Sequence, residues 1–256
     1  FPPGSRIAIL SKNTAWWMIC DYAIWMAGHV SVPLYPTLAA DTVRQILDHS
    51  GSRLLFIGKL DGFDAMRLGI RAGLPCVTTP LSPAAAPGRR WTDVLAGQAP
   101  LQDAPVRDAT ELATLMYTSG TTGKPKGVMH SFGTLMWSLQ SGMKRVHLDA
   151  HTRMLSYLPL SHVVERVLVE HGQLATGMQV FFAESLETFA SDLQRARPTC
   201  FFSVPRLWVK FQQGVHAKLP ARKLNLMLRL PIVGGMVRRK VLTALGLDQC
   251  QLAAGG

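Results

Sequence analysis

Short apolar runs alternate with helical stretches along the chain, and this alternation limits the possible folds more than any other feature of the sequence. In the first half, strands are predicted at residues 6–10 (RIAIL), 30–35 (VSVPLY) and 53–58 (RLLFIG). Helices are predicted at residues 15–28, which Asn13 or Thr14 can cap, and from Asp41 to a C-terminal cap at Gly51. This order of elements is a βαβαβ unit.

The second half repeats the alternation after a proline- and alanine-rich loop at residues 78–90. Strands are predicted at residues 111–119, 126–131, 152–160, 178–183 and 199–205. Helices are predicted at residues 132–146, 162–175, 185–196 and 206–219. The sequence therefore predicts an α/β fold, with helices flanking doubly wound, mostly parallel sheets. Such sheets bind their ligands at the carboxyl ends of strands.

The composition suits a packed globular protein, because 48% of the 256 residues are hydrophobic and 17% are charged. Asp21 interrupts the most apolar run, so no stretch reaches the about 20 apolar residues of a transmembrane helix. The opening residues show no secretory leader. The cysteines have no C-x-x-C spacing, which predicts reduced, mostly buried thiols in a cytoplasmic protein: Cys20, Cys76, Cys200 and Cys250.

The whole net charge of +11 lies in one segment. Between Leu193 and Leu247 the chain has eleven basic residues and no acidic ones, whereas the remainder has sixteen of each sign. Within residues 218–242 the basic residues alternate with leucine, methionine and valine, so segment 195–240 suits peripheral contact with an anionic membrane at its inner face. The alternative is a pair of solvated surface helices. Residues 218–242 lack interleaved exposed aromatic residues that stack on bases, so nucleic acid is not predicted as a partner.

The stretch YTSGTTGKPKG, from Tyr117 to Gly127, combines residues that suit a polyphosphate. Glycines 120, 123 and 127 permit tight turns and expose backbone amides, while hydroxyls and two lysines add donors and positive charge. It is not a Walker loop, because Gly120 and Gly123 are too close and Pro125 follows Lys124. The alternative is a flexible hairpin rich in turn-forming residues, which would leave the two lysines unexplained.

The longer stretch LMYTSGTTGKPKGVMHS resembles the signature loop of the adenylate-forming superfamily at every position. YLPLSHVVERV (157–167) and RPTCFFSVPRLWVKF (197–211) resemble segments of its long-chain fatty acyl-CoA synthetase branch, and residues 8–37 resemble its opening βαβ unit. The resemblance implies ATP-dependent activation of a long-chain fatty acid to an acyl-adenylate, followed by transfer to coenzyme A. It implies ATP, Mg²⁺ and coenzyme A as cofactor and substrates.

The resemblance also implies roles for individual residues. Those expected to contact the ATP phosphates are Thr118, Ser119, Gly120, Thr121, Thr122, Gly123, Lys126 and, with less weight, Lys124. Lys126 and His162 are expected to be catalytic, with His162 near the substrate carboxylate; the alternative is that His162 only caps the following helix. Glu165 and Arg166 are adjacent, so each is expected to pair elsewhere in a structural role.

No protein ligand for a metal ion is predicted. His147 and His151 are four residues apart, but Asp149 lies between them in a sequence typical of a turn. The sequence therefore predicts no resident metal site at this histidine pair.

The expected domain organisation also follows from the resemblance. Residues 1–256 are expected to form part of a large N-terminal domain, with subunits of about 1–110 and 111–256, and without the small C-terminal domain. The isolated chain is therefore expected to be inactive or nearly so. Two alternatives remain open: a medium-chain, aromatic or acyl-carrier ligase of the same superfamily, and a non-catalytic remnant that binds nucleotide or membrane.

Overall fold

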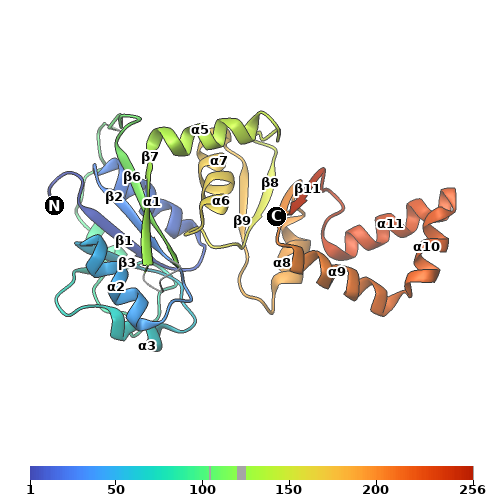
Figure 1. The fold of residues 1–256 in the computed structure, drawn as a ribbon, viewed down its shortest axis with the longest axis horizontal. Helices are drawn as coiled ribbons and strands as arrows, with labels where there is room; N and C mark the ends of the chain where they lie inside the picture. The colour runs from blue at the N-terminus through green and yellow to red at the C-terminus, as the bar shows by residue number, and fades with distance from the viewer. Residues whose placement is uncertain (104, 120–124, 256) are drawn as a thin grey trace. The chain divides into compact units, whose positions relative to one another are not determined.

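The structure is a computed structural model that describes residues 1–103, 105–119 and 125–255 (Figure 1). The chain forms two compact units. Unit 1 contains Phe1–Gly142 and Pro159–His171, and unit 2 contains Met143–Leu158 and the chain from Gly172 onward. This division differs from the expected boundary near residue 110, because the two strands that follow that point extend the sheet of unit 1.

Unit 1 is built on a seven-stranded sheet with the order β5-β4-β3-β1-β2-β6-β7. Its strands are β1 (Arg6–Leu10), β2 (Val30–Leu34), β3 (Leu54–Ile57), β4 (Cys76–Thr78), β5 (Arg89–Arg90), β6 (Leu112–Ser119) and β7 (Pro125–Ser131). All neighbouring pairs are parallel except β6 and β7. The mostly parallel α/β fold is therefore confirmed.

The first helices of unit 1 begin and end where the sequence signals them. Helix α1 (Ala15–Met26) begins after Thr14, whose side chain accepts a hydrogen bond from the Trp17 amide, so Thr14 rather than Asn13 is the cap. Helix α2 (Ala40–Ser50) ends at Gly51, which takes a left-handed φ of 61° that glycine adopts without strain. The remaining helices of this unit are α3 (Phe63–Met66), the 3₁₀ turn Arg67–Gly69, α4 (Trp91–Leu95), α5 (Phe132–Met143), α6 (Val163–Glu165) and a π-helical segment (Arg166–His171).

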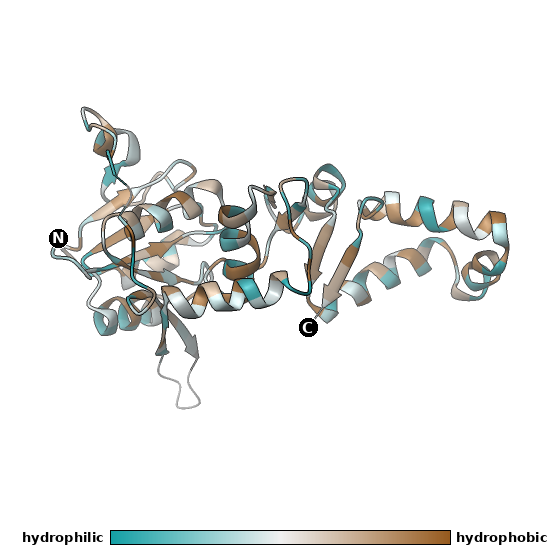
Figure 2. Ribbon diagram, turned by 90° about the horizontal axis from the view of Figure 1, so that it is seen from above, coloured by the Kyte–Doolittle hydropathy of each residue, from teal (hydrophilic) through white to brown (hydrophobic). Residues whose placement is uncertain are grey.

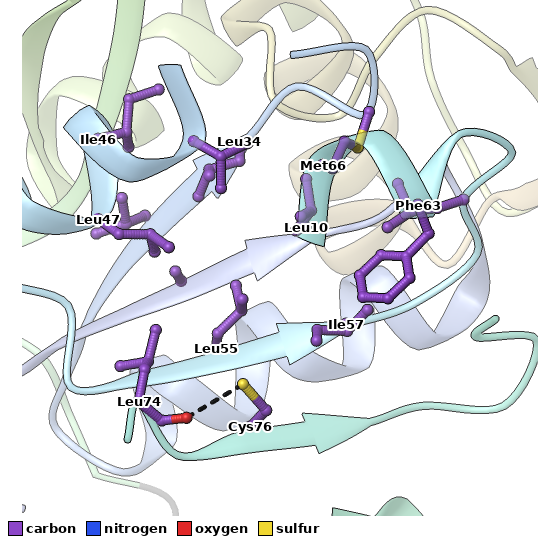
Figure 3. Packing of buried hydrophobic residues seen from close by; sticks show 14 of the residues in the cluster. Leu10, Leu34, Ile46, Leu47, Leu55, Ile57, Phe63, Met66, Leu74 and Cys76 are labelled. Atoms are coloured by element: carbon purple, nitrogen blue, oxygen red, sulfur yellow. Dashed lines mark hydrogen bonds between the residues drawn. The ribbon is translucent and has the colours of Figure 1, made fainter. Parts of the chain in front are cut away.

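The core of unit 1 lies between α2 and one face of the sheet (Figure 3). Ile46 and Leu47 of α2 pack there with Leu10, Leu34 and Leu55 of the strands. The α3 helix and the strand β4 complete this core with Phe63, Met66 and Cys76. The four cysteines are free thiols, three of them buried, as the sequence predicts.

Unit 2 contains two pairs of parallel strands. Strand β8 (Arg153–Ser156) pairs with β9 (Gln179–Phe182), and β10 (Cys200–Ser203) pairs with β11 (Leu252–Gly255). Its helices are α7 (Gly172–Thr176), α8 (Phe189–Ala196), α9 (Pro205–Lys218), α10 (Ala221–Arg229) and α11 (Pro231–Leu245). Leu155, Leu193 and Phe201 lie at the centre of a separate apolar core.

Several predicted elements are shorter than expected, and two of them have a clear local cause. The strand predicted at 152–160 ends at Ser156, because Pro159 cannot donate to a ladder and also restricts the residue before it. The helix predicted at 185–196 begins only at Phe189, after Ser185 and Thr188 have formed side-chain hydrogen bonds with local backbone groups. Among the described residues, no helix is both long and apolar enough to cross a membrane.

Candidate active site

The described residues of the signature stretch, 117–119 and 125–127, lie on the antiparallel strands β6 and β7 at the edge of the sheet (Figure 2). Thr118 is the cross-strand partner of Lys126, and Ser119 is the partner of Pro125. Cross-strand partners lie on the same face of a hairpin, so the exposed side chains of Thr118 and Lys126 lie next to each other. The other expected phosphate contacts lie outside the described residues: Gly120, Thr121, Thr122, Gly123 and Lys124.

Tyr117 fixes the base of this hairpin. Its hydroxyl is 2.7 Å from Nδ1 of His49, and the two rings meet edge to face. Burial raises the pKa of the Tyr117 hydroxyl, so this group remains a neutral partner for the histidine. A Cβ at Gly127 would lie 3.2 Å from the Tyr117 ring. The interpretation of Gly127 as a turn residue is therefore wrong: it lies within β7 and leaves room for a buried aromatic ring.

His162 caps the short helix α6. Its Nδ1 accepts a hydrogen bond of 3.3 Å from the Val164 amide, so the capping alternative describes what the ring does in this structure. Because Nδ1 is the acceptor, the proton of the neutral ring lies on Nε2. The residue is exposed, and the cap fixes the ring in the tautomer that can donate from Nε2. Capping and donating to a substrate are therefore compatible roles.

The segment that carries His162 is tied to the start of α1. The Leu160 amide donates to Oδ1 of Asn13 with a distance of 2.9 Å, across 147 positions of sequence. The His162 amide donates to the Pro159 carbonyl, and the Arg166 amide donates to the His162 carbonyl. Asn13, one of the two expected helix caps, instead holds this loop against the carboxyl end of β1.

Arg166 is fully buried at the centre of unit 1 and pairs with two acids. Its guanidinium forms an ion pair with Asp21 of α1 and lies 3.2 Å from Oε2 of Glu170. A third hydrogen bond, of 2.7 Å, reaches Oγ1 of Thr114 on β6, which in turn donates to the Ser31 carbonyl of β2. The expectation that Arg166 pairs away from Glu165 is confirmed.

Burial shifts the pKa values of two side chains in this cluster. The pKa of Glu170 is raised well above its usual value, first by burial and then by the negative charge of Asp21. The pKa of His171 is lowered to about 3 by burial and by the positive charge of Arg166, so His171 is neutral. The Arg166 guanidinium also lies over the rings of Trp17 and Trp25.

The sequence reasoning missed this cluster, although it contained a signal. Asp21 stands alone in an apolar helix, and an isolated acid on a buried face requires a buried cation. The cluster also connects the two parts of the candidate site. Thr114 lies on β6, which leads into the signature hairpin, and Arg166 follows His162 by four residues.

The fold and the positions of these residues define the class of protein: an α/β protein whose signature stretch begins at the end of strand β6 and whose His162 segment belongs to the same compact unit. The model of the family described as AMP-binding enzyme matches residues 1–246. The chain therefore belongs to the AMP-binding enzyme family, and its resemblance to the adenylate-forming superfamily and to the long-chain acyl-CoA synthetase branch is confirmed.

Curated relatives are similar over most of this chain. A long-chain-fatty-acid–CoA ligase of Gallus gallus is 29% identical over 288 aligned positions, which cover 95% of this chain and 38% of the relative. A long-chain-fatty-acid–CoA ligase of Mycobacterium bovis is 32% identical, covering 81% of this chain and 36% of the relative. The chain thus spans between a third and two fifths of the length of these two relatives.

Solved structures share the fold. The adenylation domain of a carboxylic acid reductase from Segniliparus rugosus, in complex with AMP and a carboxylic acid, has a TM-score of 0.76 with 20% identity. It covers 100% of this chain, which corresponds to 45% of that structure. A carboxylate reductase domain from Mycobacterium chelonae has a TM-score of 0.77 with 21% identity, covering 100% of this chain and 43% of its own.

Proposed function

We propose that this chain carries the phosphate-binding and carboxylate-facing part of an ATP-dependent ligase that activates a long-chain fatty acid and transfers it to coenzyme A. In the first step a carboxylate oxygen attacks the α-phosphorus of ATP, and the bond to pyrophosphate breaks. In the second step the coenzyme A sulfur attacks the acyl carbon, and AMP leaves. The observation that carries the proposal is the pairing of Thr118 with Lys126 at the end of the signature hairpin.

The described residues of the hairpin fit the phosphates of ATP. Thr118 supplies a hydroxyl donor and Lys126 an ammonium group, both exposed and on one face. Donors fixed in this way stabilise the charge that grows on departing pyrophosphate. Mg²⁺ is commonly held by phosphates with one or two carboxylates. Within the described parts of the chain no group of three candidate ligands is found, so we assign no protein ligand to the metal ion.

His162 is proposed to face the substrate carboxylate. Its Nδ1 is occupied by the helix cap, which leaves the Nε2 proton as the donor. A hydrogen bond from this donor would orient the attacking carboxylate and need not transfer a proton in the adenylation step. Asn13 and the Arg166 cluster hold the backbone on either side of this ring.

The choice of a long-chain fatty acid rests on the relatives. Ligases named for long-chain fatty acids occur among them in Gallus gallus and Mycobacterium bovis, as does a peroxisomal long-chain acyl-CoA synthetase of Arabidopsis thaliana at 31% identity. We further propose a cytoplasmic location, because four free thiols suit a reducing compartment. A peripheral contact of segment 195–240 with a membrane is a separate proposal, which does not depend on the ligase activity.

The test is pyrophosphate release by the full protein with ATP, Mg²⁺ and fatty acids of graded length. We expect release to peak with long acids and to fall by about 10²–10³ in Lys126→Ala, the usual cost of losing one donor to a developing negative charge. Lys144→Ala removes an equally exposed lysine outside the hairpin and is the matched control. Equal release by Lys126→Ala and wild type would refute the role of the hairpin.

Two further variants separate the roles of His162. Asparagine is a good helix cap but has no imidazole, so His162→Asn keeps the cap, whereas His162→Ala loses both functions. We expect both variants to lose activity and only His162→Ala to lose stability. Full activity in His162→Asn would show that His162 acts only as a helix cap. A peak with short or aromatic acids would overturn the long-chain assignment, and no release with any acid would indicate a non-catalytic remnant.

A further inference from the structure

Helices α9, α10 and α11 form a three-helix arm at one end of unit 2 (Figure 1). The arm, Pro205–Leu245, contains no acidic residue. Its nine basic residues are Arg206, Lys210, Lys218, Arg222, Lys223, Arg229, Arg238, Arg239 and Lys240. The basic residues that form ion pairs in this region, Arg195 and Arg197, come before the arm. The arm therefore presents uncompensated positive charge.

Large apolar side chains are exposed around the turn between α10 and α11. The exposed fractions are 64% for Leu226, 47% for Leu230, 80% for Ile232 and 62% for Met236. Figure 2 shows apolar and polar residues side by side along this part of the arm. A solvated surface helix accounts for the basic residues but gives no reason to gather four exposed apolar side chains at one turn.

Helices α10 and α11 pack directly against each other, and this contact defines which face of each helix points outward. A Cβ at Gly234 would lie 2.6 Å from the backbone oxygen of Leu228, so the backbone of α11 touches that of α10 there. Met227 and Leu228 are half-buried in this packing, whereas Leu226 lies on the outer face. The apolar side chains outside this contact are therefore not those that hold the arm together.

Basic residues flank the exposed apolar ones on both helices. On α10, Arg222, Lys223 and Arg229 are three or four residues from Leu226 and share its face. On α11, Arg239 and Lys240 are three and four residues from Met236, which itself follows Ile232 by four. Met236, Arg239 and Lys240 line one shallow surface depression. On α11 the cations thus lie further from the turn than the apolar side chains, whereas on α10 they flank Leu226 on both sides.

We propose that the turn between α10 and α11 inserts into the headgroup region of an anionic phospholipid bilayer. Leu226, Leu230, Ile232 and Met236 would enter the acyl boundary, and the flanking lysines and arginines would contact lipid phosphates. The helices have 9 and 15 residues, fewer than the about 20 needed to span a bilayer, so the arm lies in one leaflet.

Nucleic acid fits the arm less well than a membrane. Single strands bind through exposed aromatic rings that stack on bases. The aromatic residues of the arm, Trp208 and Phe211, instead pack against the apolar core of unit 2. The exposed apolar side chains are aliphatic, which suits hydrocarbon. The contact does not depend on ligase activity, and its test measures binding rather than turnover.

The test is flotation of the full protein with vesicles of phosphatidylcholine, or of phosphatidylcholine and phosphatidylglycerol in equal amounts. We expect binding to the anionic vesicles, a decrease with added salt, and at least about tenfold weaker binding when Arg222, Lys223, Arg239 and Lys240 are all replaced by glutamine. Lys144→Gln with Arg145→Gln, two exposed basic residues outside the arm, is the control and should bind as wild type. Equal binding by the fourfold variant, or no binding to anionic vesicles, would overturn the proposal.

A second measurement reports insertion directly. The indole introduced by Ile232→Trp should be quenched by brominated lipids in anionic vesicles, whereas one introduced by Ile19→Trp, on the exposed side of α1, should not. Ile232→Ser with Met236→Ser should weaken binding while leaving its salt dependence intact. Equal quenching at both positions, or tighter binding to duplex DNA than to the vesicles, would refute insertion of the turn.

Discussion

At the scale of single residues, the buried Arg166 shows how a charge can exist inside unit 1. The guanidinium replaces its lost hydration with Asp21, Glu170 and Thr114, and with the faces of two tryptophan rings. Such a pair is seldom more stable than apolar residues of similar size, but it is costly to break. Its benefit is positional, because it fixes the segment after His162 to both α1 and β6.

We expect Arg166→Met to lower the free energy of unfolding by about 3–5 kcal/mol, because it leaves the charge of Asp21 buried without a partner. Adding Asp21→Asn removes that charge, so the double variant should regain more than half of the loss. Urea denaturation of the two single variants and the double variant measures both effects. A loss below about 1 kcal/mol for Arg166→Met would show that the pair is not essential to the stability of the unit.

At the scale of elements, the sequence predicts those with strong local signals. The α1 and α2 helices have a clear period, and Gly51 and Thr14 mark their ends. Strands β4 and β5 were missed because they have three residues and two, too few to show a period. The local sequence does not predict the π-helical segment, Arg166–His171, because this segment accommodates contacts between Arg166 and distant residues.

Two adjacent glycines in α11 provide a matched test of helix packing in the arm. A Cβ at Gly234 would lie 2.6 Å from a backbone oxygen of α10, whereas a Cβ at Gly235 would meet nothing within 4 Å. We expect Gly235→Ala to stabilise unit 2 by about 0.5–1 kcal/mol through helix propensity. Gly234→Ala should destabilise it by about 1–3 kcal/mol because the helices must separate. Thermal unfolding monitored by circular dichroism distinguishes them, and equal effects would show that α10 and α11 do not pack as described.

At the scale of the whole molecule, the family and the mostly parallel fold could be predicted because signature and alternation are local patterns. The start of the signature stretch at a strand end was also predictable, since Ser119 ends β6. The anchoring of the His162 loop could not be predicted, because the hydrogen bond from the Leu160 amide to Asn13 joins residues 147 positions apart. Long-range contacts of this kind depend on the finished fold, and no period or spacing in the sequence encodes them.

The division into two units predicts that each unit can unfold while the other stays folded. Each has a separate core, and Phe201 is almost fully buried in that of unit 2, against Tyr157 and Trp208. Phe201→Ala should lower the free energy of unfolding by about 3–5 kcal/mol, as should Arg166→Met in unit 1. The two variants are therefore matched in their destabilisation. We expect amide hydrogen exchange to accelerate in β10 and β11 for Phe201→Ala, and in β1 and β3 for Arg166→Met. If either variant accelerated exchange equally in both sets of strands, the chain would unfold as one cooperative body, and the two units would be a feature of shape without independent stability.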